Sequence, residues 1–453
     1  MGRAGARREQ KTSQRGTILI LSQVYVPDPA AVGQYMAAVG VEMASRGYPV
    51  TVITSRNGYE NPADVYPARE VRDGVRIVRL PFSSFGKSFL FARMLGAIFF
   101  VVQAALYGLF VPHVSAVLVS TSPPVCAFAG LFLRCIRRAP FLYWLMDLNP
   151  DQLIALGALR AGSWSARMIE KMNRLALREA ATVVVLDRFM SDRVCSKVDV
   201  ASKILVIPPW PHEDHLEAIP HGRNPFRSRL GLGGKRVVMY SGNHSSSNPL
   251  WTILHAAREL DGDSNLAFVF VGGGLSKKQI EEYVTRHRMQ NVTLLPYQPF
   301  DELRYSLSAA DVHVVSLGEQ FVGILHPCKV YGAMACGRPL LYLGPEPSHV
   351  SEMLEGNDIG WHVAHGDVPA ALRALLSIRD ASPKKLTSMG AGARRLLHHR
   401  MDQVALRGAF CDSLEQVASG HSSVFHPTSS VAAGSDDRQV LEPSQESMDI
   451  GAG

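Results

Sequence analysis

The chain has 453 residues, of which 47% are hydrophobic and 19% charged, and its mean hydropathy is +0.04. This composition excludes a wholly disordered chain, a collagen-like chain and a coiled coil, and the length suits two or three domains. The net charge is +7; the basic residues 1–14 and the acidic residues 419–453 largely cancel, so the positive charge belongs to the chain between them. A basic body favours anionic partners, such as nucleotide phosphates, nucleic acid or anionic lipid.

Short apolar runs rich in β-branched residues alternate with helical patterns in the first half of the chain. Strands are expected at Thr17–Leu21, Val50–Thr54, Val75–Leu80, Ala116–Ser120, Phe141–Leu145, Thr182–Leu186 and Ile204–Ile207. Helices are expected between them, as at Val32–Arg46 and Ser163–Ala180. Continuous apolar strands joined by helices predict a parallel sheet buried on both faces. Residues 15–207 should therefore form a doubly wound α/β domain.

A second series of the same kind follows residues 208–235, which are rich in Pro, Gly and His and read as a linker. Its expected strands are Arg236–Ser241, Leu266–Val271, Val292–Leu295, Val312–Ser316 and Pro339–Leu343. Its expected helices are Leu250–Leu260, Lys277–Arg288, Phe300–Ala309, Pro327–Cys336, Pro369–Ile378 and Pro383–Arg400. Residues 236–400 should form a second doubly wound domain, followed by a helix within 401–418. The tails 1–14 and 419–453 are expected to be disordered.

The six cysteines and the N-terminus indicate the compartment. No CxxC pair occurs, so the spacing predicts neither a zinc site nor a disulfide framework. The basic N-terminal residues are not followed at once by an apolar core, which argues against a secretory signal. We therefore expect reduced cysteines in a cytoplasmic protein.

Open α/β sheets bind ligands at the carboxyl ends of their strands, so the loops there are the candidate sites. Gly33 follows a Pro-rich loop after the first strand, and Gly242 and Asn243 open a small polar loop in the second domain. Gly273 lies in a run of three glycines that also follows a strand. Such loops let a phosphate or sugar approach the backbone, although plain connections, helix caps or tight turns remain alternatives. No GxGxxG follows a strand, which argues against a dinucleotide oxidoreductase.

Three charged residues complete the candidate site. Lys329 is expected in the first turn of a helix, where the helix dipole disfavours a cation unless an anion such as a diphosphate docks there. A solvated lysine is the alternative. Asp147 follows a strand in the first domain and is placed to accept hydrogen bonds from sugar hydroxyls, while Asp151 beside it suits a helix cap. Glu319 follows a strand of the second domain.

Four stretches of the chain together resemble one known family. They are VYVPDPAAVGQYMAAVGVEMASRGYPVTVIT (Val24–Thr54), DLNPDQLIALG (Asp147–Gly157), IPPWPHEDHL (Ile207–Leu216), and the pair YSGN (Tyr240–Asn243) with HPCKVYGAMACGRPLL (His326–Leu341). In this order they resemble the retaining glycosyltransferases of family 4, in the polysaccharide-biosynthesis branch.

This resemblance implies the GT-B fold: two Rossmann-like domains facing a cleft, with the last helix crossing back to the first domain. A nucleotide-sugar donor would bind mainly to the second domain, with its diphosphate at Lys329, Val330, Tyr331, Gly242, Asn243 and Gly273, and at Gly33 of the first domain. Lys329, Asp147 and Glu319 would act at the reaction centre. The nucleotide sugar is a substrate, and neither a cofactor nor a metal is expected.

Two positions depart from the family pattern. The second glutamate of the family's two-glutamate motif, which holds the nucleotide ribose, is replaced by Gly332. The histidine that many relatives place before the DLxPD aspartate is replaced by Met146, so no catalytic histidine is assigned. A front-face transfer with the leaving phosphate as base would require no protein nucleophile.

Residues 94–112 form 19 consecutive uncharged residues, with basic residues on both sides in sequence. A membrane-spanning helix needs about 20 residues, so this length is marginal, and a span would divide the first sheet. The alternatives are a buried crossover helix and a helix that exposes an apolar face to lipid. We favour the last, with the region 87–138 lying on the inner face of the cytoplasmic membrane.

The sequence thus predicts a peripheral glycosyltransferase that moves a sugar from a nucleotide donor to a polyprenyl-diphosphate-linked glycan. Exopolysaccharide, O-antigen or capsule would be the product. A nucleotide-sugar epimerase or hydrolase on the same frame is an alternative, and so is a degenerate sugar-binding scaffold, which the two departures suggest. Nucleic-acid binding rests on charge alone and is not expected.

Overall fold

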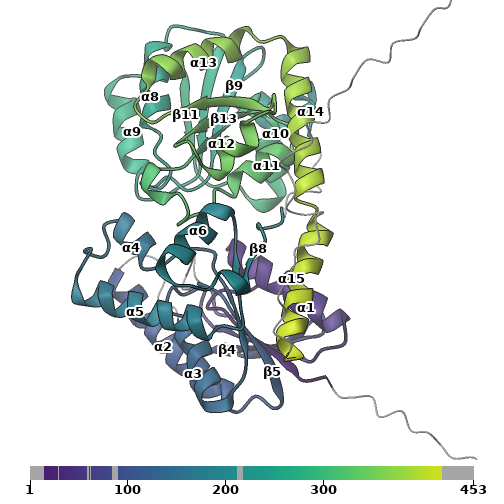
Figure 1. Cartoon of the computed structure of the whole chain (residues 1–453). Helices are drawn as coiled ribbons and strands as arrows, with labels where there is room; N and C mark the ends of the chain where they lie inside the picture. Colours follow the sequence, from purple (N-terminus) through teal and green to yellow (C-terminus); the bar gives the residue numbers. More distant parts are fainter. Residues whose placement is uncertain are drawn as a thin grey trace, which may run out of the picture.

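The computed structural model describes residues 15–28, 30–58, 61, 63–83, 90–211 and 218–420. Two α/β units, each built on its own sheet, lie one above the other, with the first unit at the bottom of Figure 1. Residues 1–14 and 421–453, which make up nearly all of the two tails predicted to be disordered, lie outside the described residues.

The first sheet has eight strands in the order β3-β4-β2-β1-β5-β6-β7-β8. All neighbours are parallel except β3 and β4, which are antiparallel. The strands are β1 (Thr17–Leu21), β2 (Val50–Ser55), β3 (Arg69–Arg72), β4 (Val75–Leu80), β5 (Val114–Val119), β6 (Phe141–Trp144), β7 (Thr182–Val185) and β8 (Ile204–Val206). The helices are α1 (Ala31–Ser45), α2 (Leu90–Gly108), α3 (Ala127–Arg137), α4 (Asp151–Ala155), α5 (Trp164–Glu179), α6 (Arg188–Lys197) and the 3-10 turn η1 (Ala201–Lys203).

The second sheet has six parallel strands in the order β11-β10-β9-β12-β13-β14. They are β9 (Arg236–Ser241), β10 (Leu266–Val271), β11 (Val292–Leu295), β12 (Val312–Ser316), β13 (Leu340–Leu343) and β14 (Gly360–Val363). The helices are α7 (Pro225–Arg229), α8 (Trp251–Glu259), α9 (Lys277–Arg286), α10 (Leu303–Ser308), α11 (Lys329–Ala335), α12 (His349–Leu354) and α13 (Val368–Asp380). The 3-10 turns are η2 (His221–Arg223), η3 (Phe300–Glu302) and η4 (Glu319–Phe321).

The central strands form because their side chains are apolar and branched and are covered on both faces of each sheet. All five residues of β1 and all six residues of β10 are buried. Because such runs are largely apolar, their positions could be predicted from the sequence to within about two residues. It missed two edge strands: β3 is REVR, largely exposed and charged, and β14 is a four-residue segment that begins with a glycine.

Several helix boundaries differ from the prediction. The helix expected at Pro327–Cys336 begins at Lys329, because Pro327 and Cys328 form the turn before it. The helix expected at Phe300–Ala309 divides into the turn η3 and the short helix α10. Asp151 does not cap α4, whose N-cap is Pro150; its carboxylate instead pairs with Arg193 and Lys197 of α6.

The segment predicted as a linker, 208–235, has contacts with both units. Trp210 is fully buried near Trp144 of the first unit, with 5.5 Å between the ring centroids. At the other end Asn224 caps α7, and Phe226 is buried against the second sheet. Residues 212–217 of this segment lie outside the described residues.

The chain ends by returning to the first unit. Helix α14 (Pro383–Arg400) runs along the second unit, and α15 (Gln403–Ala418) runs down to the first, as the yellow-green ribbon shows in Figure 1. The ring of Phe410 lies 4.3 Å from that of Trp144, between centroids, and Arg46 of α1 pairs with Asp412 at 2.6 Å. The predicted crossing of the last helix back to the first domain is confirmed.

Candidate active site at the domain junction

Both sheets place a predicted binding loop at the point where their strand order reverses. Strand β1 lies between β2 and β5, and β9 lies between β10 and β12. The loops that follow these two strands lead to Gly33 and to Gly242, respectively. Such switch points open a crevice at the carboxyl ends of the strands, which is the usual ligand site of doubly wound sheets.

The glycines after β9 and β10 bring two backbone segments into direct contact. Gly242 has φ +150°, and Gly272 and Gly274 have similar positive values. A Cβ atom on Gly272 would lie 2.0 Å from the carbonyl oxygen of Gly242, and one on Gly274 would lie 2.3 Å from that of His244. No other residue type would fit without displacing backbone, so these glycines define a cradle of peptide groups at the carboxyl ends of β9 and β10.

Lys329 lies across this cradle. A Cβ atom on Gly242 would stand 2.0 Å from Cε of Lys329, so the lysine stem rests directly on the glycine. The ammonium donates to Oδ1 of Asn248 at 3.2 Å and lies 5.6 Å from the ring centroid of Tyr240. Burial disfavours its charged form and lowers the pKa of Lys329 to about 8. A half-buried ammonium group held by an amide oxygen and an aromatic ring is well placed to bind an incoming anion.

Tyr297 is a neighbour of the cradle that sequence reasoning missed. Its ring lies 3.1 Å from where a Cβ on Gly273 would stand, and its hydroxyl donates to the Gly273 carbonyl at 3.4 Å. The side chain is 58% exposed. The available signal was an aromatic residue two positions after the strand β11.

Asp147 lies where the first unit meets the second. Its backbone forms an antiparallel bridge with Leu325, and the next amide, that of Leu148, donates to the Ile324 carbonyl at 3.0 Å. Burial raises the pKa of the Asp147 carboxyl to about 6, against a smaller lowering by a hydrogen bond from Gln152. The predicted acid therefore stands at the junction itself.

Three other predicted site residues, Gly33, Val330 and Glu319, have contacts of a different kind. Gly33 lies inside α1 and packs on the backbone of Tyr25, because a Cβ atom on this glycine would stand only 3.0 Å from Cα of Tyr25. Val330 is fully buried in the core, and its N–H donates to the Pro327 carbonyl at 3.1 Å. Glu319 is exposed in η4, next to Gln320, which donates to the Ala155 carbonyl of α4 at 3.0 Å.

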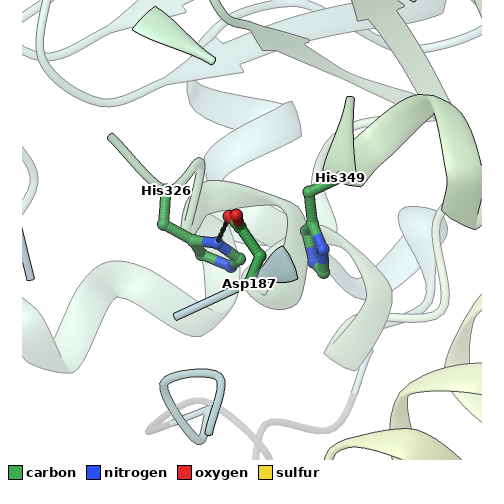
Figure 2. A group of neighbouring side chains, drawn as sticks. All are labelled: Asp187, His326 and His349. Atoms are coloured by element: carbon green, nitrogen blue, oxygen red, sulfur yellow. Dashed lines mark hydrogen bonds and ion pairs between the residues drawn. The ribbon is translucent and has the colours of Figure 1, made fainter. Parts of the chain in front are cut away.

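A second cluster, not predicted from the sequence, joins the two units beside Lys329. Asp187 caps α6 of the first unit, His326 precedes α11, and His349 begins α12 of the second unit. Figure 2 shows the Asp187 side chain between the two histidines, with its carboxylate at the ring of His326. His326 Nδ1 donates to Oδ2 of Asp187 at 2.7 Å, and its Nε2 lies 2.6 Å from the hydroxyl of Tyr331.

Tyr331 extends this chain of hydrogen bonds to His349, whose Nε2 lies 3.2 Å from its hydroxyl. Burial raises the pKa of Asp187, but the hydrogen bond and charge of His326 outweigh it and hold that pKa below its usual range. Burial and the neighbouring His326 lower the pKa of His349 to about 3. His349, with its lowered pKa, is neutral and can donate from Nε2 to the Tyr331 hydroxyl.

The same three side chains have the chemistry of a metal site. Asp187, His326 and His349 each bring one ligand atom within 4.8 Å of the others, and two imidazoles with a carboxylate suit a transition metal. Both carboxylate oxygens are engaged, however: Oδ1 accepts from the Met190 amide at 2.8 Å and Oδ2 from His326. We interpret the cluster as a hydrogen-bonded link between the two units.

Two family models match this chain. The model described as "Glycosyl transferase 4-like domain" matches residues 30–210, and the one described as "Glycosyl transferases group 1" matches residues 235–381. Together they span both units, and the second contains Gly242, Gly273 and Lys329.

Similar proteins agree with these models. The chain is 24% identical over 390 residues to WbjE of Pseudomonas aeruginosa, described as a probable glycosyltransferase, covering 85% of this chain and 94% of WbjE. It is 23% identical over 337 residues to WcaI of Escherichia coli K12, named for colanic acid biosynthesis, covering 71% of this chain and 81% of WcaI.

Among solved structures, Anabaena HepE in complex with UDP and glucose has the same fold. It matches with a TM-score of 0.67 at 16% identity, covering 89% of this chain and 100% of HepE. The two facing units, the returning helix α15 and both family matches lead to one conclusion: the chain belongs to the family 4-type glycosyltransferases and is a transferase of the GT-B fold.

Proposed function

We propose that this glycosyltransferase moves a sugar from a nucleotide-diphosphate donor to a lipid-linked glycan during surface polysaccharide assembly. The observation that carries the proposal is the half-buried Lys329, which rests on Gly242 at the switch point of the second sheet. The name of WcaI supports the polysaccharide context, and the UDP in the HepE structure supports a nucleoside diphosphate as the leaving group.

The donor diphosphate would lie over the cradle of Gly242, Asn243 and Gly273, with Lys329 against its charge. When the diphosphate binds, the ammonium of Lys329 would exchange its hydrogen bond to a neutral amide for one to a phosphate oxygen. This exchange would restore the full charge of Lys329 and place that charge where the leaving group becomes negative. Tyr297 would stack on the nucleobase from its exposed position beside Gly273.

In the transfer step, the hydroxyl oxygen of the acceptor glycan forms a bond to the anomeric carbon while the bond from that carbon to the diphosphate oxygen breaks. The hydroxyl proton passes to the leaving diphosphate on the same face of the sugar, which retains the anomeric configuration. Lys329 stabilises the diphosphate, so the scheme assigns this task to a side chain rather than to a metal.

Asp147 and Glu319 have supporting roles in this proposal. Asp147 lies at the junction of the units and would accept hydrogen bonds from donor-sugar hydroxyls when ionised, above its pKa of about 6. Glu319, exposed in η4 close to α4, would contact the sugar or the acceptor from the second unit.

A transfer assay tests the proposal. A panel of labelled nucleotide sugars is incubated with a lipid-linked glycan fraction, and with no acceptor as a parallel reaction. We expect label in the glycan with one donor, with retained configuration by NMR, and a loss of about 10²–10³-fold in Lys329→Met. Lys385→Met, which removes a surface lysine paired with Asp358, is the matched control.

Two results would contradict the proposal. Transfer by Lys329→Met at the parent rate would show that Lys329 does not act at the reaction centre. Equally rapid conversion of the donor without acceptor would favour the epimerase or hydrolase instead.

A further inference from the structure

The first unit carries an apolar surface on the side away from α1 and α15. Helices α2, α3 and α5 lie side by side there, with α3 in contact with both of the others (Figure 1). Each exposes large apolar side chains at a spacing of about four residues, which places them in one stripe per helix. They are Met94, Ile98, Phe99, Val102 and Leu106 on α2, Phe132 and Ile136 on α3, and Trp164, Met168 and Leu175 on α5.

Two members of this surface are unusually exposed. Phe110, just after α2, is 83% exposed, and Trp164 at the start of α5 is 75% exposed. Isolated apolar residues are common on protein surfaces, but these stripes lie on neighbouring helices, and such a grouping is typical of a surface that binds a partner. We call these stripes, with Phe110, the apolar face.

Basic side chains accompany the apolar face. The three helices carry seven Arg or Lys residues, against the two acids Glu170 and Glu179. Lys171 is exposed within the α5 stripe itself, between Met168 and Leu175. Arg167 is exposed on the same helix, and Arg138 is exposed at the end of α3. Exposed apolar groups among cations are complementary to an anionic lipid surface, which offers both hydrocarbon and negative head groups.

None of the described helices is long and apolar enough to cross a membrane, α2 among them. The 94–112 segment instead belongs to α2 and the turn after it, with one side buried on the first sheet through Phe100 and Ala104. Its other side lies in the apolar face.

We propose that the apolar face of α2, α3 and α5 is a docking surface for an anionic bilayer, on which the enzyme lies without spanning it. The chain runs from α4, whose Ala155 carbonyl contacts Gln320 of the second unit, to Trp164 of this face within nine residues. One end of the docked face is therefore linked by a short segment of chain to the junction of the two units, where the proposed function places a lipid-linked acceptor. Membrane docking itself does not depend on the donor chemistry.

Co-sedimentation with vesicles tests this surface. We expect the full chain to pellet with vesicles containing phosphatidylglycerol and to stay in solution with phosphatidylcholine alone, with the bound fraction falling as salt rises. The double variant Ile98→Asp/Val102→Asp should lose binding by at least about tenfold. Lys171→Glu should weaken it by about fivefold or more, because a cation near an anionic surface is replaced by an anion.

The control for the apolar variants is Leu275→Asp, which places one negative charge at a 94% exposed leucine of the second unit and should bind like the parent. Trp164 provides a direct readout, because brominated lipid should quench a fluorescence component that Trp164→Phe lacks.

Three results would overturn the inference. The first is that the parent binds neither vesicle, and the second is that the Ile98→Asp/Val102→Asp variant binds as well as the parent. The third is that this variant changes its oligomeric state while neither protein binds vesicles, which would make the face an interface between copies. Nucleoside diphosphate binding by the same variants should be unchanged, so failure of docking is distinguishable from failure of the proposed function.

Discussion

At the scale of single residues, the glycines of the second unit have different tasks that the sequence does not distinguish. Gly242 has a positive φ and lies against Lys329, whereas Gly332 lies inside α11 with Leu307 Cδ1, at 3.7 Å, as the nearest atom to an added Cβ. The fold therefore leaves room for a Cβ atom at Gly332, the position that departs from the family pattern.

These two glycines should respond in opposite ways to alanine. Gly332→Ala should raise stability by about 0.5–1 kcal/mol, because alanine loses less backbone entropy than glycine in a helix. Gly242→Ala should lower stability and weaken nucleoside diphosphate binding, because alanine rarely adopts this backbone conformation and its Cβ would displace Lys329. Thermal unfolding and calorimetric titration measure both; a lower melting temperature for Gly332→Ala would contradict this description of its surroundings.

At the scale of elements, the starts of α6 and α12 and the turn before α11 meet in one hydrogen-bonded cluster. Asp187 and His326 are 139 positions apart and belong to different units. No spacing rule connects such residues, so nothing in the local pattern could pair them. The switch-point loops, by contrast, were predictable, because apolar strands and the glycines after them are local patterns.

The cluster should make stability depend on pH through His349. Its pKa is lowered to about 3 in the fold, compared with about 6.5 in an unfolded chain. Between these two pKa values the unfolded state binds a proton at His349 and the folded state does not. The free energy of unfolding therefore decreases as pH falls from about 6.5 toward 3, by up to about 1.4 kcal/mol for each pH unit. Asp187, with a lowered pKa, contributes only below about pH 4.

His349→Asn, which removes the titration, should show a smaller drop in melting temperature between about pH 6.5 and 4.5 than the parent. His399→Asn, at an exposed position of α14, is the control and should behave like the parent. An unchanged drop in His349→Asn would show that His349 titrates normally and that the cluster does not hold it neutral.

At the scale of the whole molecule, the two mainly parallel sheets were predictable from the residues alone, because their apolar strands are local patterns. The return of the last helix to the first unit was expected only from the family resemblance. How the units meet was not predictable. Leu148 and Ile324 share a backbone hydrogen bond, Arg188 pairs with Glu352, and Phe410 packs on Trp144. Each contact depends on the relative placement of the units, which no local pattern encodes. The junction therefore positions Asp147 opposite the segment that leads to Lys329.

The central claim, that Lys329 and the glycine cradle hold the donor diphosphate, is tested most directly by calorimetry with a panel of nucleoside diphosphates. With a lowered pKa of about 8, part of the Lys329 population is neutral near that pH, and an anion should restore its charge. We predict binding of one nucleoside diphosphate near pH 8 with proton uptake, revealed by buffers of different ionisation enthalpy, and affinity that falls as pH rises further. In Lys329→Met, both the affinity and the proton uptake should be lost. Equal affinity of the parent and Lys329→Met for the same nucleoside diphosphate would contradict the claim.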